Sequence, residues 1–259
     1  MKVRPGSCLG FIPARGGSKS VPQKNLTLLA GRPLIDYCIT SAKASLFLNR
    51  IICSTDSHNI IARCMELGIN IDHRPESLAE DNSLLFDVLA EYLLRTQRND
   101  GFIPEIIALI QPTSPFLLVE HIDGSIKILL DDQKAASTQT VIECPHNHHA
   151  YNQRLVESGR VSFRFPGERR QAYNKQKKPK HYLFGNIVVF RVMAALEQGT
   201  VFAEPSLANK IHPFYGFDCD GPDDFMIGEA MLTSGLVSIP IMHEEVGTKL
   251  SAAKSVKAE

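Results

Sequence analysis

The first candidate for chemistry is the stretch GFIPARGGSKSVPQKN, Gly10–Asn25, in which an apolar run breaks into two glycines, a serine and separated cations. Gly16 and Gly17 would let the backbone come close to a ligand and present amide N–H groups to it. Arg15 can donate two parallel hydrogen bonds to phosphate oxygens, whereas Lys19 supplies a point charge. The GxxxxGK[ST] spacing of a Walker A loop is absent. The stretch therefore predicts a triphosphate-binding loop of another kind, with an ordinary solvated loop as the alternative.

The second candidate is FDCDGPDDF, which places Asp218 and Asp220 late in the chain. On a strand, residues two apart point the same way, ~7 Å from each other, so both carboxylates can converge on one cation while Cys219 faces the core. Mg²⁺ favours a few carboxylates together with phosphate oxygens and water. The pair therefore predicts a magnesium site at a strand end, and two solvated carboxylates are the alternative.

Composition limits the class of protein to which these stretches belong. The 259 residues contain 28 Lys and Arg against 28 Asp and Glu, and this balance argues against general nucleic-acid binding, which needs a basic surplus. No apolar run approaches the ~18 residues of a membrane span, and the first residues lack the apolar core of a signal peptide. Six scattered cysteines without a CxxC pair indicate reduced thiols and no structural zinc. We therefore expect a soluble, cytoplasmic globular protein.

The elements that must position these residues alternate between strand and helix. The candidate strands are Cys8–Ile12, Arg50–Ser54, Ile69–Ile71, Glu105–Pro112 and Asn186–Phe190. Candidate helices begin at Pro33, after Ser57, and at Leu84, Val119 and Pro222. This alternation predicts an α/β fold, a doubly wound, mostly parallel Rossmann-like sheet with helices on both faces. Ligands bind beyond the carboxyl ends of such strands, so the loop after Ile12 would lie at the binding edge. Thr55–Ser57 ends a strand there too; we interpret it as helix capping first, with a ligand role as the alternative.

The pattern changes after about residue 140. Residues 141–183 show little helical periodicity, and RVSFRF (Arg160–Phe165) alternates like a hairpin strand. We therefore divide the chain into a nucleotide-binding α/β domain of residues 1–140 and 184–242, an inserted β-rich region of residues 141–183, and a flexible tail of residues 243–259. The insert is strongly basic between residues 160 and 180. Its cations there are Arg160, Arg164, Arg169, Arg170, Lys175, Lys177, Lys178 and Lys180.

The motifs resemble those of a known family. IPARGGSK followed by PxKN is similar to the signature of the acylneuraminate cytidylyltransferases, the CMP-sialic acid synthetase family of sugar nucleotidyltransferases. The resemblance continues in the family's order through AGRPLIDYCITSA, STDSHNIIARCMELG, RPESLAEDNS, LIQPTSPF and FDCDGPDDF, and covers roughly residues 8–130 and 212–235. It implies transfer of CMP from CTP to the anomeric hydroxyl of an acidic α-keto sugar, similar to sialic acid, with release of pyrophosphate.

The resemblance also implies roles for single residues. The nucleotide-binding residues carried over by position are Arg15, Ser18, Lys19, Asn25, Arg74 and Ser83. The first three would hold the triphosphate, and Arg74 would help to read the base. Gln111, in QPTSP, would approach the acceptor sugar, while Asp218 and Asp220 would bind Mg²⁺.

The expected chemistry follows from charge. In-line attack by the sugar hydroxyl on the α-phosphate builds negative charge on the phosphate oxygens and on the departing pyrophosphate. Magnesium held by the two aspartates, together with Arg15, Lys19 and the loop amides, would offset that charge where it develops. The group that accepts the hydroxyl proton stays open between Asp218 and a water on the metal.

The insert is where the chain departs from the family. A similar region in the family helps to form a homodimer and reaches over the partner's active site, where basic groups meet the sugar carboxylate. RRQ (Arg169–Gln171) resembles the family's RQ motif and implies acceptor binding by Arg170, but the usual DLP is replaced by AYN, and NG by FGN. The acceptor therefore stays open between sialic acid and another nonulosonate, a Kdo-like sugar or a phosphonate, and for the insert itself the alternative is a flexible basic arm that binds nothing in particular. For the whole protein, the alternatives are the use of another nucleoside triphosphate or a catalytically silent nucleotide-binding protein.

Overall fold

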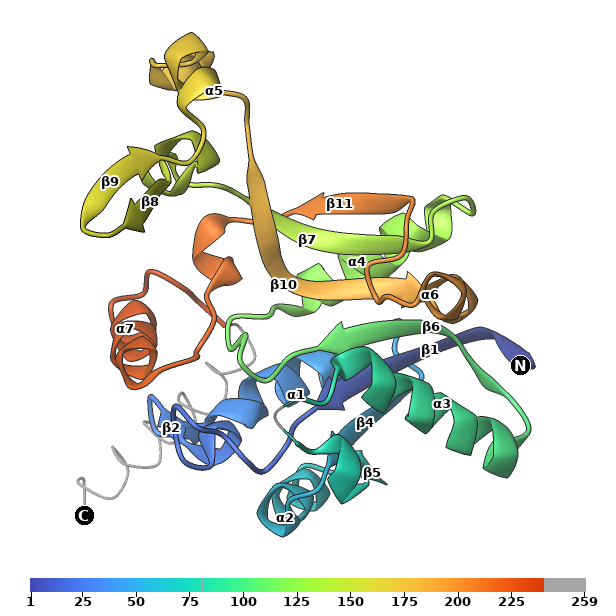
Figure 1. The fold of residues 1–259 in the computed structure, drawn as a ribbon. Helices are drawn as coiled ribbons and strands as arrows, with labels where there is room; N and C mark the ends of the chain where they lie inside the picture. The colour runs from blue at the N-terminus through green and yellow to red at the C-terminus, as the bar shows by residue number, and fades with distance from the viewer. Residues whose placement is uncertain (81, 240–259) are drawn as a thin grey trace, which may run out of the picture.

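A seven-stranded sheet forms the centre of the computed structural model, which describes residues 1–80 and 82–239 (Figure 1). In the order in which they lie side by side, the strands are β11 (Ser206–Lys210), β7 (Ser137–Glu143), β10 (Tyr182–Arg191), β6 (Ile103–Ile110), β1 (Val3–Pro13), β4 (Arg50–Thr55) and β5 (Asn70–His73). Strand β10 runs antiparallel to both of its neighbours, and the other pairs are parallel. The predicted mostly parallel α/β sheet is confirmed. The tail predicted for residues 243–259 lies outside the described residues.

Helices cover both faces of this sheet (Figure 1). On one face lie α1 (Leu34–Ala44), α2 (His58–Glu66) and α4 (Val119–Asp131), and on the other lie α3 (Leu85–Asp100) and α6 (Val192–Gln198). The predicted N-cap of α2 is confirmed, because the Ser57 hydroxyl accepts a hydrogen bond from the N–H of Ile60 at 3.5 Å. Among the described helices, none has the length and apolar character that crossing a lipid bilayer would require.

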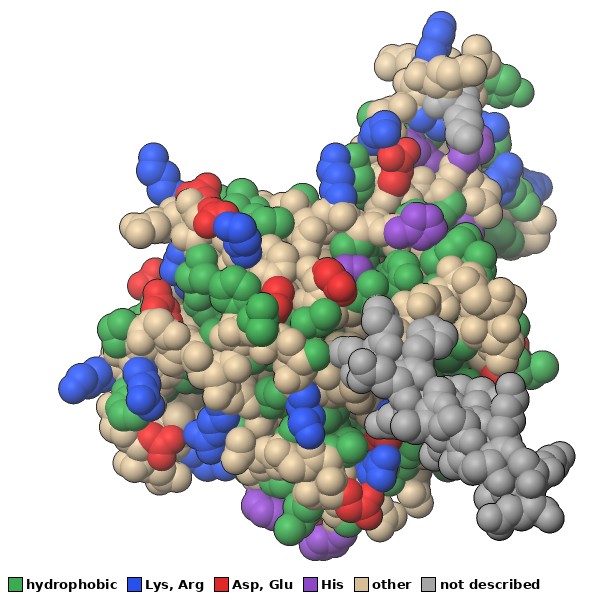
Figure 2. All heavy atoms as spheres, turned by 180° about the vertical axis from the view of Figure 1, so that it is seen from behind, with side chains coloured by type: hydrophobic (Ala, Val, Ile, Leu, Met, Phe, Trp, Pro, Cys, Tyr) green, Lys and Arg blue, Asp and Glu red, His purple; other side chains and the backbone are tan. Residues whose placement is uncertain are grey.

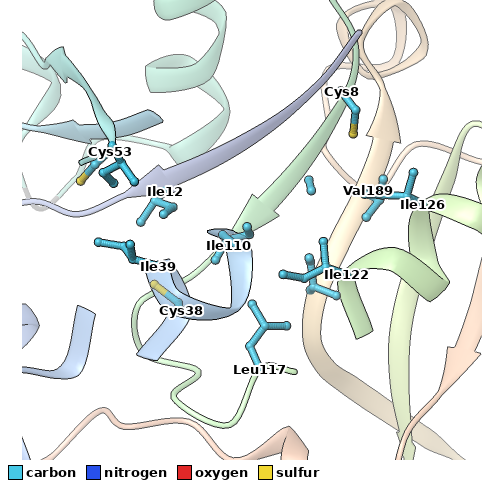
Figure 3. Packing of buried hydrophobic residues seen from close by; sticks show 14 of the residues in the cluster. Cys8, Ile12, Cys38, Ile39, Cys53, Ile110, Leu117, Ile122, Ile126 and Val189 are labelled. Carbon is cyan, nitrogen blue, oxygen red and sulfur yellow. The ribbon is translucent and has the colours of Figure 1, made fainter. Parts of the chain in front are cut away.

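Strand β1 shows how both layers arise from one apolar run. Ile12 packs with Ile39 of α1 and Ile122 of α4 in the cluster drawn in Figure 3. Phe11 points to the opposite face, where its ring centroid lies 5.2 Å from that of Tyr92 in α3. Successive side chains of a strand face opposite ways, so an uninterrupted apolar run fills two cores at once. Full burial of a side chain of this size contributes about 1.5–3 kcal/mol to stability.

The prediction that Asp218 and Asp220 lie at the end of a strand is wrong. Asp218 and Asp220 do not lie on a strand; residues 217–220 are extended chain without a sheet partner, between the 3₁₀ turn η6 (Pro213–Gly216) and helix α7 (Pro222–Thr233). The expected alternation nevertheless holds, because Cys219 is fully buried while both aspartates are exposed. Extended chain alternates its side chains whether or not it joins a sheet.

Residues 144–181, between β7 and β10, form a projecting segment that we call the arm (Figure 1). It contains the antiparallel hairpin β8 (Arg154–Glu157) and β9 (Arg160–Phe163), which confirms the predicted hairpin, and the short helix α5 (Pro166–Gln171), which was not predicted. Figure 2 shows basic and histidine side chains gathered on it. Of the insert predicted at residues 141–183, the first three residues belong to β7 and the last two to β10.

Candidate active site

A cleft of about 350 Å³ opens where β1 and β6 end, at the carboxyl edge of the sheet. Its lining residues are Pro13, Arg15, Gly17, Ser18, Lys19, Ser20, Lys24, Asn25, Leu85, Gln111, Pro112 and Thr113. We call it the carboxyl-edge cleft. Half of the predicted site residues line it, namely Arg15, Gly17, Ser18, Lys19, Asn25 and Gln111. This is the edge at which doubly wound sheets bind ligands.

The loop after β1 is fixed by bonds to its own backbone and to the neighbouring strand. The N–H of Ala14 donates to the carbonyl of Ser54 at 3.0 Å, which prolongs the pairing of β1 with β4. The side-chain amide of Asn25 donates to the carbonyl of Arg15 at 3.0 Å. Asn25 therefore shapes the loop that carries Arg15, in addition to lining the cleft.

The two glycines of this loop have different surroundings. The N–H of Gly16 donates to Oδ1 of Asp56 at 2.8 Å, and a Cβ added to Gly16 would lie 2.8 Å from the Cβ of Ser57. A Cβ added to Gly17 would meet open space. In this structure the lack of a Cβ at Gly16 permits close contact with the start of α2, and its N–H is bound to Asp56, whereas Gly17 is the glycine that lines the cleft.

The acidic segment meets the loop at this cleft. The ammonium of Lys24 lies 2.9 Å from Oδ1 of Asp220, and the hydroxyl of Ser20 donates to the backbone carbonyl of Asp220 at 2.5 Å. On the other side, the N–H of Cys219 donates to the carbonyl of Thr113 at 2.7 Å. The N–H of Asp220 donates to Oδ2 of Asp224, in the first turn of α7, at 2.9 Å. The predicted cationic loop and acidic pair are therefore neighbours in space.

Asp218 and Asp220 have the chemistry of metal ligands. Although the Asp218 side chain is exposed on one side, desolvation of its carboxylate by the groups packed around it raises the pKa of Asp218 above its ordinary value. A hydrogen bond from Thr113 opposes this shift, and the charge of Asp220 raises the pKa further. Two adjacent carboxylates repel each other unless a proton or a cation lies between them, so the pair fits a divalent cation. Among the described residues, no group of three or more His, Cys, Asp and Glu could hold a metal ion. The other ligands would be phosphate oxygens and water, which Mg²⁺ favours.

A buried polar network holds the acidic segment against the sheet. Asn186 of β10 is fully buried, and its Nδ2 donates to the carbonyl of Tyr215 at 2.9 Å and to Nδ1 of His121 at 3.0 Å. The hydroxyl of Thr140 accepts from the N–H of Asn186 at 2.8 Å. A Cβ at Gly185 would lie 2.6 Å from that hydroxyl, so only glycine permits the contact. The FGN sequence thus positions the segment that leads to Asp218.

Arg74 lies behind the loop rather than in the cleft lining. It follows β5 at the same edge, is 9% exposed, and donates to the carbonyl of Ser54 at 2.9 Å. Burial lowers the pKa of Arg74, and the negative charge of Asp56 opposes this shift. Asp56 also accepts from the N–H of Gly16, so it interacts with both the buried guanidinium and the loop backbone.

Two further predicted residues, Ser83 and Arg170, neither line the cleft nor contact the loop or the acidic segment in the bonds given above. Ser83 lies in the turn before α3, where its hydroxyl is 3.5 Å from the carbonyl of Ser77. Arg170 is exposed on α5, and the arm carries it away from the cleft within one chain (Figure 1). The adjacent Arg169 packs inside the arm, with its guanidinium 4.1 Å from the centroid of the Phe163 ring.

Three contributors to the site were not among the predicted residues: Ser20, Thr113 and Asn186. Asp56 lies in Thr55–Ser57, for which a ligand role was the alternative to helix capping. Thr113 follows the carboxyl end of β6, and that position is the signal that could have identified it. Ser20 and Asn186 offer no such signal, because the groups they bind lie far along the chain.

Comparison with known proteins adds independent information. The model of a family described as cytidylyltransferase matches residues 9–161. CMP-N,N'-diacetyllegionaminic acid synthase of Legionella pneumophila is 31% identical over 229 residues, which cover 86% of this chain and 95% of that protein. N-acylneuraminate cytidylyltransferase of Streptococcus agalactiae serotype III is 27% identical over 220 residues, covering 83% of this chain but 51% of the relative. The chain therefore spans about half the length of the streptococcal protein.

A solved structure supports the fold assignment. The structure of CMP:2-keto-3-deoxy-manno-octonic acid synthetase complexed with CTP superimposes with a TM-score of 0.65 at 15% identity, covering 88% of this chain and 99% of the other. At that identity the likeness concerns the fold. Family membership rests instead on the sequence matches, which agree with the motifs. The chain belongs to the cytidylyltransferase family of nucleotidyltransferases, and its resemblance to the acylneuraminate cytidylyltransferases is confirmed.

Proposed function

We propose that this protein transfers CMP from CTP to the anomeric hydroxyl of an acidic α-keto sugar of the nonulosonate class and releases pyrophosphate. One observation carries the proposal beyond family membership: the cationic loop and the acidic pair meet at one cleft, with Lys24 2.9 Å from Asp220. A metal–triphosphate complex needs cations for its oxygens and carboxylates for its metal, side by side.

The triphosphate would lie along the loop. Arg15 and Lys19 would bind phosphate oxygens, and Gly17 and Ser18 would approach them from the cleft wall. Asn25 keeps the loop in shape, and Arg74 and Ser83, next to the cleft, would serve the base and ribose side after a local rearrangement. These cations offset charge that develops on the α-phosphate and on the leaving pyrophosphate, and so stabilise the transition state more than the ground state.

Asp218 and Asp220 would hold Mg²⁺. The ion, when bound, supplies positive charge to the phosphate oxygens and favours departure of pyrophosphate. Lys24, which neutralises Asp220 in this structure, would then be released to the phosphates. This exchange of partners couples nucleotide binding to the acidic pair through the chain's own lysine.

The acceptor would lie between Gln111 and a basic surface supplied by the arm. Arg170 is exposed at the end of the arm and remote from its own cleft, so we propose a homodimer in which it serves the partner's cleft. Apolar side chains that stay exposed on the hairpin, such as Val156 and Val161 at 71% and 64%, fit such an interface. The arm would then be the dimerisation and acceptor-binding region.

The test is a survey of substrates. Purified protein with Mg²⁺ is incubated with each nucleoside triphosphate and with N-acetylneuraminate, N,N'-diacetyllegionaminate or Kdo, while pyrophosphate is measured and products are identified by mass spectrometry. We expect pyrophosphate release and a CMP-sugar with CTP and one of the two nonulosonates. Release with another triphosphate, or only with Kdo, would correct the substrate class. No release with any combination would contradict the enzyme proposal.

A further inference from the structure

A second cavity, of about 570 Å³, lies at the opposite edge of the sheet, where the parallel strands begin. Residues of β1, β4, β5 and β6 and the second half of α3 line it, and none of them lines the carboxyl-edge cleft. We call it the amino-edge cavity. Its volume lies within the range of small-molecule sites, about 300–1,000 Å³.

The amino-edge cavity owes its shape to an irregularity in β1. The register of β1 on β6 shifts between Arg4 and Cys8, and β1 pairs with β4 only from Leu9 onward. The bulged residues are tied down, because the N–H of Gly6 donates to Glu105 Oε2 at 2.7 Å and Ser7 accepts from the N–H of Glu105 at 3.0 Å. The opening between β1 and β4 is therefore held by specific bonds rather than left to collapse.

The walls of this cavity combine positive charge with ring faces. The guanidinium of Arg4 lies 4.9 Å from the centroid of the Phe102 ring, and no carboxylate pairs with Arg4 among the described residues. Arg50 adds a second guanidinium, 3.7 Å from Asp100, and both partners of that pair are about half exposed. Such a long, solvated pair is weak and leaves Arg50 able to bind another anion.

The other lining groups could bind a ligand that carries several hydroxyl groups. Asn49, Asn70 and Thr96 contribute amide and hydroxyl groups, and the buried Tyr92 and the Phe102 ring beside Arg4 contribute apolar wall. Asn49 Oδ1 accepts from the N–H of Cys8 and Asn70 Nδ2 donates to the carbonyl of Ile51, so the amide N–H₂ of Asn49 and the amide oxygen of Asn70 are the groups that can bind sugar hydroxyls. We infer that the amino-edge cavity is a second binding site, for a small sugar anion, a sugar phosphate or a sugar acid, and that its occupancy changes nucleotide affinity at the carboxyl-edge cleft.

Two elements, β1 and α3, each contribute residues to both the carboxyl-edge cleft and the amino-edge cavity. Pro13 at one end of β1 lines the carboxyl-edge cleft, and Arg4 at the other end lines the amino-edge cavity. Helix α3 spans the same distance, with Leu85 at the cleft and Tyr92 and Thr96 at the cavity (Figure 1). A ligand that shifts α3 along the sheet would therefore act on both sites.

The binding test uses the absence of tryptophan from this chain. Phe102→Trp places one selectively excitable fluorophore against Arg4, in the wall of the cavity. The protein is titrated with glucose 6-phosphate, gluconate, neutral glucose and inorganic phosphate, each up to about 10 mM, beyond the millimolar Kd of a weak small ligand. We expect a saturable change in emission with glucose 6-phosphate or gluconate and none with glucose. The two anions distinguish a phosphate from a carboxylate ligand.

Matched variants assign the signal to the cavity. In the Phe102→Trp background, Arg4→Ala should weaken binding about tenfold or more, because a charged hydrogen bond is lost. Arg98→Ala removes an exposed arginine of α3 that does not line the cavity, and should change nothing. Equal responses of the two variants, equal responses to glucose and to the anions, or no saturable response would overturn the site. This measurement does not depend on the proposed function.

The coupling is tested by reciprocity on the unsubstituted chain. The Kd of CTP, measured by calorimetry with and without the bound anion, should change about fivefold or more, and CTP should change the Kd of the anion by the same factor. Anion binding that leaves the Kd of CTP unchanged would overturn the coupling. A chain that binds the anion but no CTP would contradict the proposed function and leave the cavity assignment standing.

Discussion

The carboxyl-edge cleft and the arm differ in the sequence separation of the contacts that build them. In the cleft, Ser20 and Lys24 reach Asp220 across 200 and 196 residues. In the arm, Arg169 and Lys178 both bind Asn152, 17 and 26 residues away, so the arm is held mainly by its own residues. The cleft is thus a product of the whole fold, whereas the arm is a local unit attached at β7 and β10.

The two halves of the proposed reaction would therefore be specified in different regions of the molecule. Long-range contacts fix the cationic loop against the acidic pair within one chain, and there the sequence keeps the family's motifs. The arm presents basic and apolar groups that nothing within the chain covers among the described residues, and there the sequence departs from the family. Nucleotide chemistry would therefore be intrinsic to one chain, while acceptor choice would depend on the arm and a second copy.

Removal of a carboxylate from the cleft should have the largest effect on activity. Asp220→Ala should lower kcat by on the order of a thousandfold, because charge on the departing pyrophosphate loses its stabilisation. Asp223→Ala is the matched control, an exposed aspartate in the first turn of α7, and should turn over normally. Steady-state pyrophosphate release and thermal unfolding are measured for both. A near-normal rate for Asp220→Ala would show that Asp220 does not hold Mg²⁺, and the proposed role of the acidic pair in the cleft would be wrong.

Much of the cleft could be predicted from the sequence because its lining residues follow the carboxyl ends of strands. Apolar runs predicted β1, β4 and β6, and the carboxyl-edge rule placed the loop after β1 at the binding edge. Gln111 was assigned through the family resemblance. Strand β7 was missed because its sequence, STQTVIE, begins with polar residues. In the structure Ser137, Thr138 and Thr140 are nevertheless buried. Hydropathy does not show that the hydroxyls of Ser137 and Thr140 have hydrogen-bond partners far along the chain. The anchoring of Asp218 through Asn186 was missed for the same reason.

Substitutions of Thr140 and Thr138 test whether the hydrogen bonds between β7 and β10, where the arm joins the sheet, contribute to the stability of the fold. The Thr140 hydroxyl accepts from the N–H groups of Asn186 and Ile187 at 2.8 and 2.9 Å, whereas the buried Thr138 hydroxyl has no partner among the described residues. Thr140→Val should therefore lower the free energy of unfolding by about 2–4 kcal/mol, since it leaves buried donors unpaired. Thr138→Val, on the same strand, should be neutral or slightly stabilising. Both are measured by urea denaturation, and equal losses would show that Thr140 anchors nothing.

His121 makes this anchoring sensitive to acid. Its Nδ1 accepts from Asn186 and from the N–H of Leu118, and burial lowers the pKa of His121 to about 4 from the ordinary 6.5. The unfolded chain binds the proton first, so the contribution to stability is complete above pH 6.5 and is lost as pH falls toward 4. By pH 5 the loss should reach about 2 kcal/mol.

The measurement is urea denaturation at pH 7 and pH 5 for the wild type and for His121→Gln, which keeps an acceptor that does not titrate. The variant should lose about 2 kcal/mol less stability between the two pH values. His73→Gln removes an exposed histidine and should behave as the wild type. If the stability of all three proteins depended on pH in the same way, protonation of His121 would not be the cause of the loss of stability in acid.

Removal of Arg170 from the arm should reduce activity less than removal of Asp220. Arg170→Ala should raise the KM of the acceptor about tenfold, the worth of one charged hydrogen bond to a carboxylate, and leave the KM of CTP unchanged. Arg160→Ala, which removes an exposed arginine from β9, is the control and should change neither. Because Arg170 lies away from its own cleft, the effect requires a partner copy, so light scattering should find a dimer for both variants. A monomer with normal acceptor KM would show that a single chain binds the sugar by itself, and Gln111 and the cleft wall would then have to supply the specificity that we assign to the arm.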